Sequence, residues 1–401
     1  MKILFVTSFY SAITDSVILN KWSPSGMPAI TKLYETLFSE KHKFDNIYID
    51  RSANKNDVNQ IHNNRFNNQN SILSFSNTTN LKYFTHLKQT FNSILIIRYV
   101  YNKICNHNYN LLYVDRANLL VGACLAYFGY DVVLRLHGVN VLFENFSKLS
   151  YRIMNPLKLV AMYAPFKCII ATKDGSPSDQ FLMKYSRNKS VYTLLNGIDE
   201  INNLDLKRNN DLNIPDDLPV FLFVSRLTED KGIMDLIYTI IALKDYLNDF
   251  YTIIVGDGEC FDKVKALIDE NSLNNILLTG AVNHSLIYEY YNYADVYISL
   301  NKIGNLSNTV LEAVNSGKCI ITFNACKNSF RDISTINFFK DAALYIDRHD
   351  IINQLMLMIV KLIYNPQLIA DKKYQILKCK TKLDLWNIRI KKELKLILKH
   401  E

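Results

Sequence analysis

The sequence lacks several patterns that would place it in a common class. No run approaches the roughly 18 apolar residues of a membrane-spanning helix. The N-terminus, Met-Lys-Ile-Leu-Phe-Val, has a short apolar stretch but no signal-peptide cleavage site. The seven cysteines form no C-x-x-C pair, and no His cluster has metal-ligand spacing. We therefore expect a cytoplasmic protein from a reducing compartment, without structural zinc.

Further absent motifs argue against several classes of enzyme and binding protein. No strand-like run is followed by G-x-G-x-x-G, which argues against a dinucleotide-dependent dehydrogenase. There is no Asp-x-Asp motif to carry a divalent ion, and no zinc finger, recognition helix or RNP-type motif. We therefore expect no cofactor, no metal and no nucleic-acid partner.

The composition is that of a globular protein large enough for two domains. Of 401 residues, 49% are hydrophobic and 21% charged. Residues 1–200 hold 22 Lys and Arg against 13 Asp and Glu, whereas residues 201–401 hold 24 against 25. A basic first half beside a neutral second half suggests that the first meets an anionic surface, with the inner face of a membrane favoured. Ordinary surface charge remains the alternative.

Short apolar runs alternate with helical patterns through both halves. This alternation predicts an α/β fold with two doubly wound, Rossmann-like parallel sheets whose carboxyl edges face one cleft. We expect an N-terminal domain at 1–200, a linker at 201–218 and a C-terminal domain at 218–382, with a basic helix at 383–401 returning to the first domain. The expected strands are 2–6, 46–49, 111–114, 132–136, 168–172, 191–194, 220–224, 251–255, 275–279, 295–299 and 319–323.

Three segments of the first half stand apart from this alternation. A polar loop after the first strand carries Gly26 and precedes a helix expected at 27–40. Residues 54–80 contain ten Asn, which predicts a long mobile surface segment. Helical patterns at 81–105 and 145–167 mix aromatic and basic residues, a composition that fits peripheral membrane contact as well as ordinary core packing.

The segment 304–317 carries the clearest functional signal. It lies between two strand-like runs, begins a helix near Ser307, Asn308 and Thr309, and ends at Gly317. A helix that begins after a strand presents N–H groups at its positive end, which is an anion site. Glu312 has two interpretations: a capping-box residue for its own helix, or a carboxylate that holds the ribose of a nucleotide.

Other candidates follow expected strands. Arg226 and Lys231 surround the strand-to-helix turn after 220–224, and Gly256 ends the next strand, where tight turns and phosphates both favour glycine. His137 follows the strand 132–136, where parallel sheets place ligand groups. Gly26 would let the backbone approach a phosphate or acceptor, unless it only serves a turn.

Together these motifs resemble glycosyltransferase family four, the glycosyl transferases group 1 of retaining enzymes with the GT-B fold. The matching elements are Ser225-Arg226-Leu227 with Lys231-Gly232, Gly256-Asp257-Gly258, Ala294-Asp295-Val296, Leu311-Glu312-Ala313, Asn196-Gly197-Ile198-Asp199, His137-Gly138 and the run from Asp341 to Asp347. One position departs. The family usually has a second Glu eight residues before the Leu-Glu-Ala one, and here that residue is Gly304.

The resemblance implies a role for each matching residue. Arg226 and Lys231 would bind the diphosphate and stabilise the leaving group, and Glu312 would hold the ribose. The amides of Thr309 and Val310 would reach the phosphates, and His137 would lie beside the transferred sugar. With Gly304 in place of Glu, Asn305 or Asn308 would read the sugar.

The expected reaction transfers a sugar from a UDP- or GDP-linked donor to an acceptor hydroxyl with retention, without a metal. The expected acceptor is a glycan or lipid-linked intermediate of surface polysaccharide assembly, reached by peripheral membrane contact through the N-terminal domain. Two alternatives stay open: a sugar-nucleotide epimerase of the same fold, and an inactive GT-B binding partner of another transferase.

Overall fold

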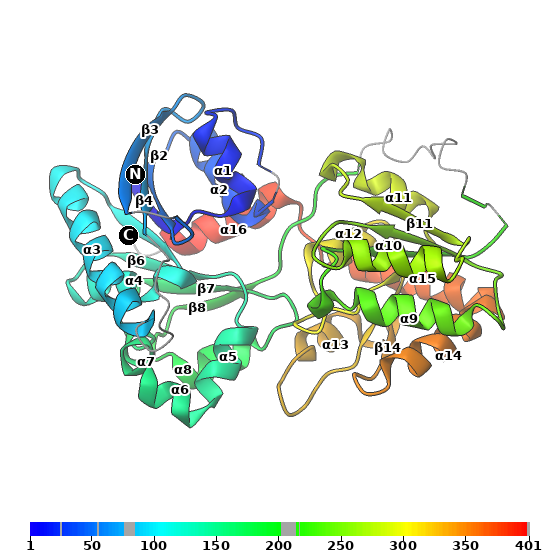
Figure 1. Ribbon diagram of the computed structural model, residues 1–401. Helices are drawn as coiled ribbons and strands as arrows, with labels where there is room; N and C mark the ends of the chain where they lie inside the picture. Colours follow the sequence, from blue (N-terminus) through cyan, green and yellow to red (C-terminus); the bar gives the residue numbers. More distant parts are fainter. Residues whose placement is uncertain (25, 54–55, 76–84, 202–213, 216, 399–401) are drawn as a thin grey trace. The chain divides into compact units, whose positions relative to one another are not determined.

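The computed structural model describes residues 1–401 except 25, 54–55, 76–84, 202–213, 216 and 399–401 (Figure 1). The chain divides into two compact units. Unit 1 comprises Met1–Thr172, Ser178–Leu194 and Asn387–Glu401, and unit 2 comprises Lys173–Pro177 and Leu195–Trp386. Most of the linker expected at 201–218 lies outside the described residues.

Within its described residues, unit 1 is built on a sheet with strand order β3-β4-β2-β1-β5-β6-β7-β8. β3 pairs antiparallel with β4, and the other neighbouring strands pair in parallel. The strands are β1 (Lys2–Ser8), β2 (Lys43–Asp50), β3 (Asp57–Asn63), β4 (Asn68–Ser74), β5 (Leu111–Asp115), β6 (Val132–Leu136), β7 (Cys168–Thr172) and β8 (Val191–Leu194). Parallel pairing of the central strands follows from the helices that connect them.

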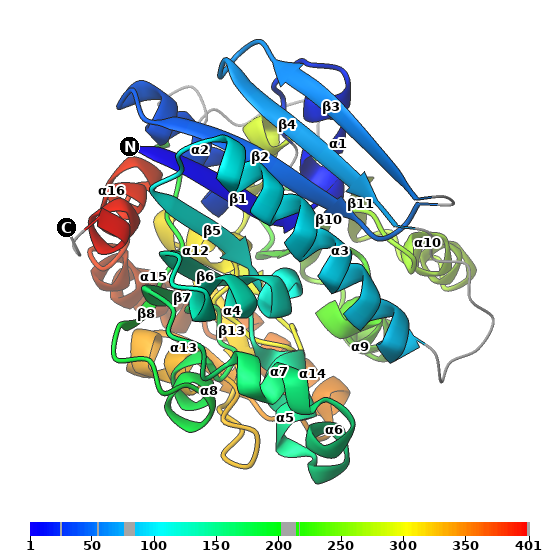
Figure 2. The same cartoon turned by 90° about the vertical axis from the view of Figure 1, so that its left-hand side faces the viewer.

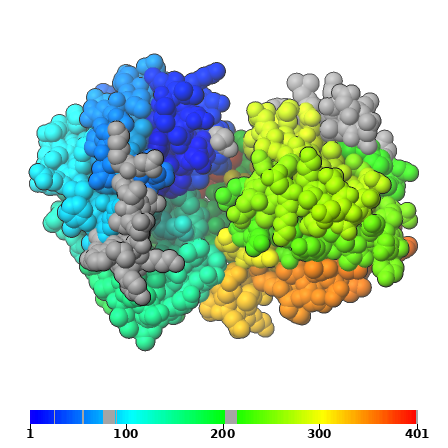
Figure 3. Space-filling model, viewed as in Figure 1, coloured from blue at the N-terminus to red at the C-terminus, as the bar shows by residue number. Residues whose placement is uncertain are grey.

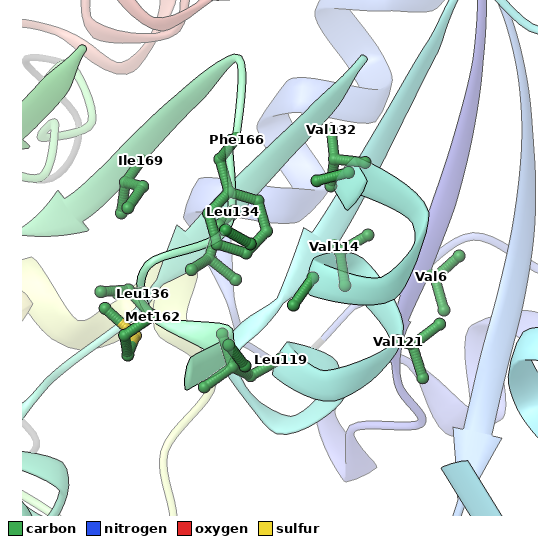
Figure 4. Packing of buried hydrophobic residues seen from close by; sticks show 14 of the residues in the cluster. Val6, Val114, Leu119, Val121, Val132, Leu134, Leu136, Met162, Phe166 and Ile169 are labelled. Atoms are coloured by element: carbon green, nitrogen blue, oxygen red, sulfur yellow. The ribbon is translucent and has the colours of Figure 1, made fainter. Parts of the chain in front are cut away.

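Alternating side chains divide between the two faces of this sheet. Leu112 and Val114 face a core shared with α3, α4, α5, α7 and α8, part of which Figure 4 shows, whereas Tyr113 OH donates to Glu393 of α16. The helices of unit 1 are α1 (Ser11–Ile18), α2 (Pro28–Ser39), α3 (Thr85–Asn106), α4 (Leu119–Tyr127), α5 (Asn140–Ser147), α6 (Leu149–Met154), α7 (Pro156–Ala161), α8 (Ser178–Tyr185) and α16 (Trp386–Leu398). Helices thus cover both faces, as continuous apolar strands require.

Two sequence predictions in unit 1 were wrong. The Asn-rich segment is not a mobile loop over its described part, because β3 and β4 form a hairpin that extends the sheet beside β2. Asn63, Asn68 and Asn70 of this segment are buried, and Asn70 Oδ1 accepts from Asn46 Nδ2 of β2 at 2.9 Å. The polar loop expected from β1 to Gly26 was also wrong, because the helix α1 (Ser11–Ile18) occupies its first part.

Unit 2 is a sheet of strand order β11-β10-β9-β12-β13-β14 within its described residues. Neighbouring strands pair in parallel throughout. The strands are β9 (Val220–Val224), β10 (Tyr251–Val255), β11 (Ile276–Gly280), β12 (Val296–Ile298), β13 (Cys319–Phe323) and β14 (Leu344–Ile346). This order is that of a dinucleotide-type doubly wound sheet, in which the direction of winding reverses between β9 and β12.

Helices cover both faces of the unit 2 sheet. Phe221 and Phe223 face a core formed with α9, α10 and α14, and Leu222 and Val224 face α11, α12 and the end of α15. The helices are α9 (Ile233–Leu243), α10 (Phe261–Glu270), α11 (Ile287–Tyr293), α12 (Asn308–Asn315), α13 (Ile333–Phe339), α14 (Ile351–Ile363) and α15 (Pro366–Lys380). None of the helices in the described part of the chain has the length and hydropathy needed to cross a bilayer.

Candidate functional site

Most of the sequence-predicted residues lie at one edge of the unit 2 sheet. Because its strands are parallel, their carboxyl ends and the loops that follow them share an edge. β9 and β12 are neighbours at the point where the winding reverses, and such a switch point leaves a crevice between the loops that follow the two strands. The segments that follow β9, β10 and β12 therefore form the candidate site.

Backbone hydrogen bonds join the turn after β9 to the turn after β10. Ser225 N donates to the Val255 carbonyl at 3.1 Å, and Leu227 N donates to the Asp257 carbonyl at 2.9 Å. A Cβ at Gly256 would lie 1.8 Å from the Ser225 carbonyl oxygen, and its φ of +140° also disfavours a side chain. Glycine is therefore required here, and the close approach leaves Arg226 exposed at the sheet edge.

Lys231 ends a short 3-10 helix (Glu229–Lys231), directly before α9. Its Nζ lies 3.5 Å from Asp230 Oδ2. Burial raises the pKa of Asp230, but a hydrogen bond from Thr228 and the charge of Lys231 outweigh it and lower that pKa below its usual value. The Asp230 carbonyl accepts from Lys302 N at 2.8 Å, which joins this segment to the loop after β12.

Asn305 is held inside that loop. Its side chain is fully buried, and its Oδ1 accepts from Ser299 Oγ at 2.6 Å and from Asn301 N at 3.2 Å. Its Nδ2 donates to the Asn301 carbonyl at 2.9 Å and to Asp332 Oδ2 at 3.0 Å. All four hydrogen-bonding positions of the amide are used. The expectation that this side chain contacts a sugar therefore does not fit the structure, in which it shapes the loop.

Asp332 is the hub of the same network. It is fully buried, and its Oδ1 accepts from Asn305 N at 2.8 Å and from Thr335 Oγ1 at 2.7 Å. Arg348 forms an ion pair with its Oδ2 and stacks on Phe323, with 4.4 Å to the ring centroid. Burial raises the pKa of Asp332, opposed by the charge of Arg348.

Gly304 has a steric explanation. A Cβ at this residue would lie 2.7 Å from three backbone atoms, Asp174 O, Gly175 C and Ser176 N. A hydrogen bond holds the segment after β7 against the loop after β12, since Leu306 N donates to the Asp174 carbonyl at 3.0 Å. The main chain of residues 174–176 therefore leaves no room for the Glu that the resembled family usually has.

The N-terminus of α12 is open. Ser307 is its N-cap residue, and the Ser307 side chain makes no capping hydrogen bond to the first turn, which includes the amides of Thr309 and Val310. Tyr297 OH lies 2.9 Å from Thr309 Oγ1 and donates to the Val224 carbonyl at 3.2 Å, which fixes the helix end beside β9. Asn308 Oδ1 accepts from Asn196 Nδ2 at 2.7 Å. The positive end of the helix dipole is thus directed at the edge where β9 ends.

Glu312 does not cap its own helix. Its Oε1 lies 3.1 Å from His284 Nε2, and its Oε2 lies 3.3 Å from Tyr291 OH, while only 8% of the side chain is exposed. Tyr291 OH also donates to the Thr309 carbonyl at 2.7 Å. Burial, and next the Glu312 charge, raise the pKa of Tyr291 well above its usual value, so its hydroxyl stays a donor.

The two remaining candidates, His137 and Gly26, belong to unit 1. His137 follows β6, and its Nε2 is enclosed without a hydrogen-bond partner. Burial, assisted by the charge of Arg135, lowers the pKa of His137 to about 3, so its imidazole is neutral at physiological pH. Gly26 lies in the loop between α1 and α2, with Ala12 Cβ 3.2 Å from where its own Cβ would be.

Sequence reasoning missed several residues that shape these edges. In unit 2 they are His284, Tyr291, Tyr297 and Asp332. In unit 1, the buried Asp115 accepts from Ser8 N at 2.7 Å and from Tyr10 OH at 2.6 Å, at the edge where β1 and β5 end. None of them belongs to a recognisable motif, although the position of Asp115 at the end of an apolar strand was visible.

Within the described residues, no group of three or more His, Cys, Asp or Glu side chains is placed to hold a metal ion. The candidate site combines the N-terminus of α12, the cations Arg226 and Lys231, and the carboxylate of Glu312.

Comparison with solved structures identifies the class of fold. Sucrose-phosphate synthase from Thermosynechococcus elongatus aligns with a TM-score of 0.70 at 16% identity, covering 100% of this chain and 99% of that one. HepE of Anabaena, solved in complex with UDP, aligns with a TM-score of 0.67 at 14% identity, covering 100% of both chains. The predicted GT-B fold is confirmed by these alignments.

Sequence comparison finds similar glycosyltransferases over part of the chain. Residues 206–335 match the family model described as glycosyl transferases group 1. Two uncharacterized glycosyltransferases of Methanocaldococcus jannaschii are similar to this chain. One is 28% identical over 171 residues, which is 41% of each chain. The other is 35% identical over 101 residues, which is 25% of this chain and 26% of that one. The matches thus span less than half of the length of these curated relatives. The family match covers about a third of the chain, so the comparisons show a similarity to the glycosyl transferases group 1 over that part.

Proposed function

We propose that this protein is a retaining glycosyltransferase that moves a sugar from a nucleotide diphosphate sugar to an acceptor hydroxyl, without a divalent metal. The observation that carries the proposal is the meeting of three features at the carboxyl edge of the unit 2 sheet. They are the uncapped N-terminus of α12, the cations Arg226 and Lys231, and the nearly buried carboxylate of Glu312.

These features suit a nucleoside diphosphate. The helix N-terminus offers N–H groups to phosphate oxygens, and the cations offset the two negative charges. Glu312, oriented by His284 and Tyr291, has a carboxylate that can accept from ribose hydroxyls. As the glycosidic bond breaks, charge grows on the departing diphosphate, and preorganised donors stabilise it there. We infer a displacement on one face of the sugar, with the configuration retained.

For the donor, we propose a UDP- or GDP-linked sugar. UDP is the first choice, because the similar HepE structures hold UDP and UDP-glucose. For the acceptor, we propose a glycan or lipid-linked intermediate of surface polysaccharide assembly. The basic charge of residues 1–200 and the similarity to WaaG, a glycosyltransferase of lipopolysaccharide biosynthesis, support this choice.

Isothermal titration of UDP, GDP and UDP-glucose tests the donor site. We expect Lys231→Ala to weaken binding about 10- to 100-fold, the loss of a charge-assisted contact of roughly 1.5–3 kcal/mol. Glu312→Gln should weaken nucleotide binding about tenfold for the same reason. The control is Lys265→Ala, which removes an exposed cation on α10 and should leave the affinity unchanged.

Turnover assays separate the remaining alternatives. The anomeric configuration of the product, read by NMR, tests retention, and activity in a chelator tests metal independence. Conversion of the donor without any acceptor would indicate an epimerase, and absence of nucleotide binding by the wild type would sink the donor site altogether.

A further inference from the structure

An unusually apolar surface covers the outer helices of unit 1. Six aliphatic side chains on α5, α6 and α7 are each 52–70% exposed: Val141, Leu149, Ile153, Met154, Leu157 and Val160. Leu149 and Ile153 lie four residues apart on α6, and Leu157 and Val160 lie three apart on α7, so each pair shares a face of its own helix. We call these six residues the apolar helical surface. The α5 and α6 region lies at the outer edge of unit 1 in the ribbon and space-filling views (Figures 1 and 3).

The same helices have a separate buried face. Phe143 and Phe146 of α5 and Ala161 of α7 pack into the unit 1 core. The exposed aliphatic side chains are therefore not needed to hold the helices in place. Contiguous exposed apolar residues on a folded protein usually mark an interaction site.

The charges carried by α6, α7 and the segment before them are basic. Lys148, Arg152 and Lys158 are interleaved with the apolar residues, and α6 and α7 contain no Asp or Glu. The neighbouring α3 and α4 also contain none. Two carboxylates also lie on these helices or beside them: Glu144 of α5 accepts from Asn140 Nδ2 at 2.9 Å, and Asp179 is exposed on α8, which packs on α5.

A second apolar region lies next to this surface in the same helical layer. α3, α4, α7 and α6 lie side by side on one face of the sheet (Figures 1 and 2). α3 and the end of α4 form a pocket of about 550 Å³ lined by Ile94, Ile97, Arg98, Tyr101, Phe128 and Tyr130. This region repeats the pattern of apolar side chains with a single basic charge.

We propose that the apolar helical surface docks on a membrane of anionic lipids. Aliphatic side chains would enter the boundary between head groups and acyl chains, while Lys148 and Arg152 meet lipid phosphates. A protein partner fits less well, because the hot spots of protein interfaces favour Tyr, Trp and Arg and seldom use Leu or Val, and none of these six exposed residues is aromatic. The choice of a membrane-bound acceptor rests on the proposed function, but the docking itself needs only this surface.

Co-sedimentation of the full-length chain with lipid vesicles tests the proposal. Vesicles of phosphatidylcholine alone are compared with vesicles that also contain phosphatidylglycerol. The wild type should bind the anionic vesicles, and more weakly as salt is added. Ile153→Glu should reduce binding at least about tenfold, since it replaces an inserted side chain by a charge that the anionic surface repels. Lys148→Gln should reduce binding about fivefold on anionic vesicles only.

The matched control is Leu357→Glu. Leu357 on α14 of unit 2 is 70% exposed, as is Ile153, so the two variants add the same charge at equally exposed apolar positions. Leu357→Glu should bind vesicles like the wild type. The surface assignment is overturned if the wild type ignores anionic vesicles, if Ile153→Glu binds normally, or if Leu357→Glu loses binding equally. It is also overturned if size-exclusion chromatography shows a dimer that Ile153→Glu dissociates while vesicles are not bound. Nucleotide titration of the same preparations separates these results from a failure of the donor site.

Discussion

Nε of Arg135 on β6 lies 3.4 Å from Oε1 of Glu393 on α16, and both side chains are completely buried. Tyr113 OH donates to the same carboxylate oxygen at 2.7 Å, and Arg389 pairs with the other oxygen. Burial raises the pKa of Glu393, but the charges of Arg389 and Arg135 outweigh it and lower that pKa to about 2. This cluster attaches the last helix of the chain to the sheet of unit 1.

Glu393→Gln should destabilise unit 1 by about 3–5 kcal/mol at neutral pH, because two buried arginines lose their counter-charge. The folded-state pKa lies below the usual 4.5, so the stabilisation by Glu393 is complete above pH of about 4.5 and is lost as pH falls toward 2. Urea unfolding followed by circular dichroism at pH 7 and near pH 3 measures both effects. The wild type should lose more stability over this interval than the variant.

The control for this prediction is Asp131→Asn. Asp131 Oδ2 pairs with Lys167 at 2.9 Å, but its side chain is half exposed. A pair of this kind contributes about 0–1 kcal/mol. Equal losses for the two variants would contradict the assignment of a buried ionic cluster to Glu393.

His137 should remain neutral throughout the physiological range. Its folded-state pKa of about 3 lies below the usual 6.5, so the unfolded chain binds a proton there first, and its contribution to stability falls as pH drops from about 6.5 to about 3. In NMR spectra, the Cε1 proton of His137, assigned by its disappearance in His137→Gln, should keep its chemical shift from pH 8 to pH 5. A titration midpoint near 6.5 would show that the ring is solvated.

Tyr291→Phe should weaken nucleotide binding several-fold with little change in melting temperature. The hydroxyl contacts both the Thr309 carbonyl and Glu312 Oε2, so its loss frees the carboxylate to turn, whereas the ring keeps its packing. Calorimetric titration with UDP measures the change. Tyr290→Phe, on the same helix, is the control and should bind as the wild type does. If Tyr291→Phe also binds normally, Glu312 is oriented by His284 alone.

Gly304→Ala should destabilise unit 2 by about 3 kcal/mol or more, the upper range for overpacking, because its Cβ would meet rigid backbone at 2.7 Å. Gly122→Ala is the comparison. Its Cβ would meet only side chains, at 3.2–3.5 Å, and helical position favours Ala, so its effect should stay within about 1 kcal/mol. Thermal and urea unfolding give both values. A Gly304→Ala variant as stable as the wild type would leave the missing family Glu without a steric reason.

The sheets could be predicted because their strands are continuous apolar runs. Strands such as β6, β7, β9 and β13 coincide with the predicted residues, since each is buried on both faces and bounded by polar turns. The hairpin of β3 and β4 was not predictable in this way. Its Asn residues have low strand propensity, and the burial of Asn70 depends on Asn46 of the neighbouring β2, whose Nδ2 donates to Asn70 Oδ1.

Some residues of the candidate site could likewise be predicted from the sequence, and others could not. The motif around Glu312 and the glycine at 256 were visible because they depend on local backbone geometry and short-range order. The partners of Glu312 come from α11 and the segment before it, and no local pattern marks them. Asn305 was misassigned because its burial depends on Asp332, which a separate loop supplies.

For this protein, the amino-acid sequence by itself determined the alternation of strands and helices, the resemblance to a glycosyltransferase family and the place where a diphosphate is expected. Local periodicity, turn residues and helix ends carry that information, since neighbouring residues act on one another through the backbone. Tertiary structure alone decided which of the polar side chains face solvent and which are buried and hydrogen-bonded within the protein. The sequence alone showed that Gly304 stands where the resembled family has a Glu side chain. Only the packing of residues 174–176 against it explains why no side chain fits there.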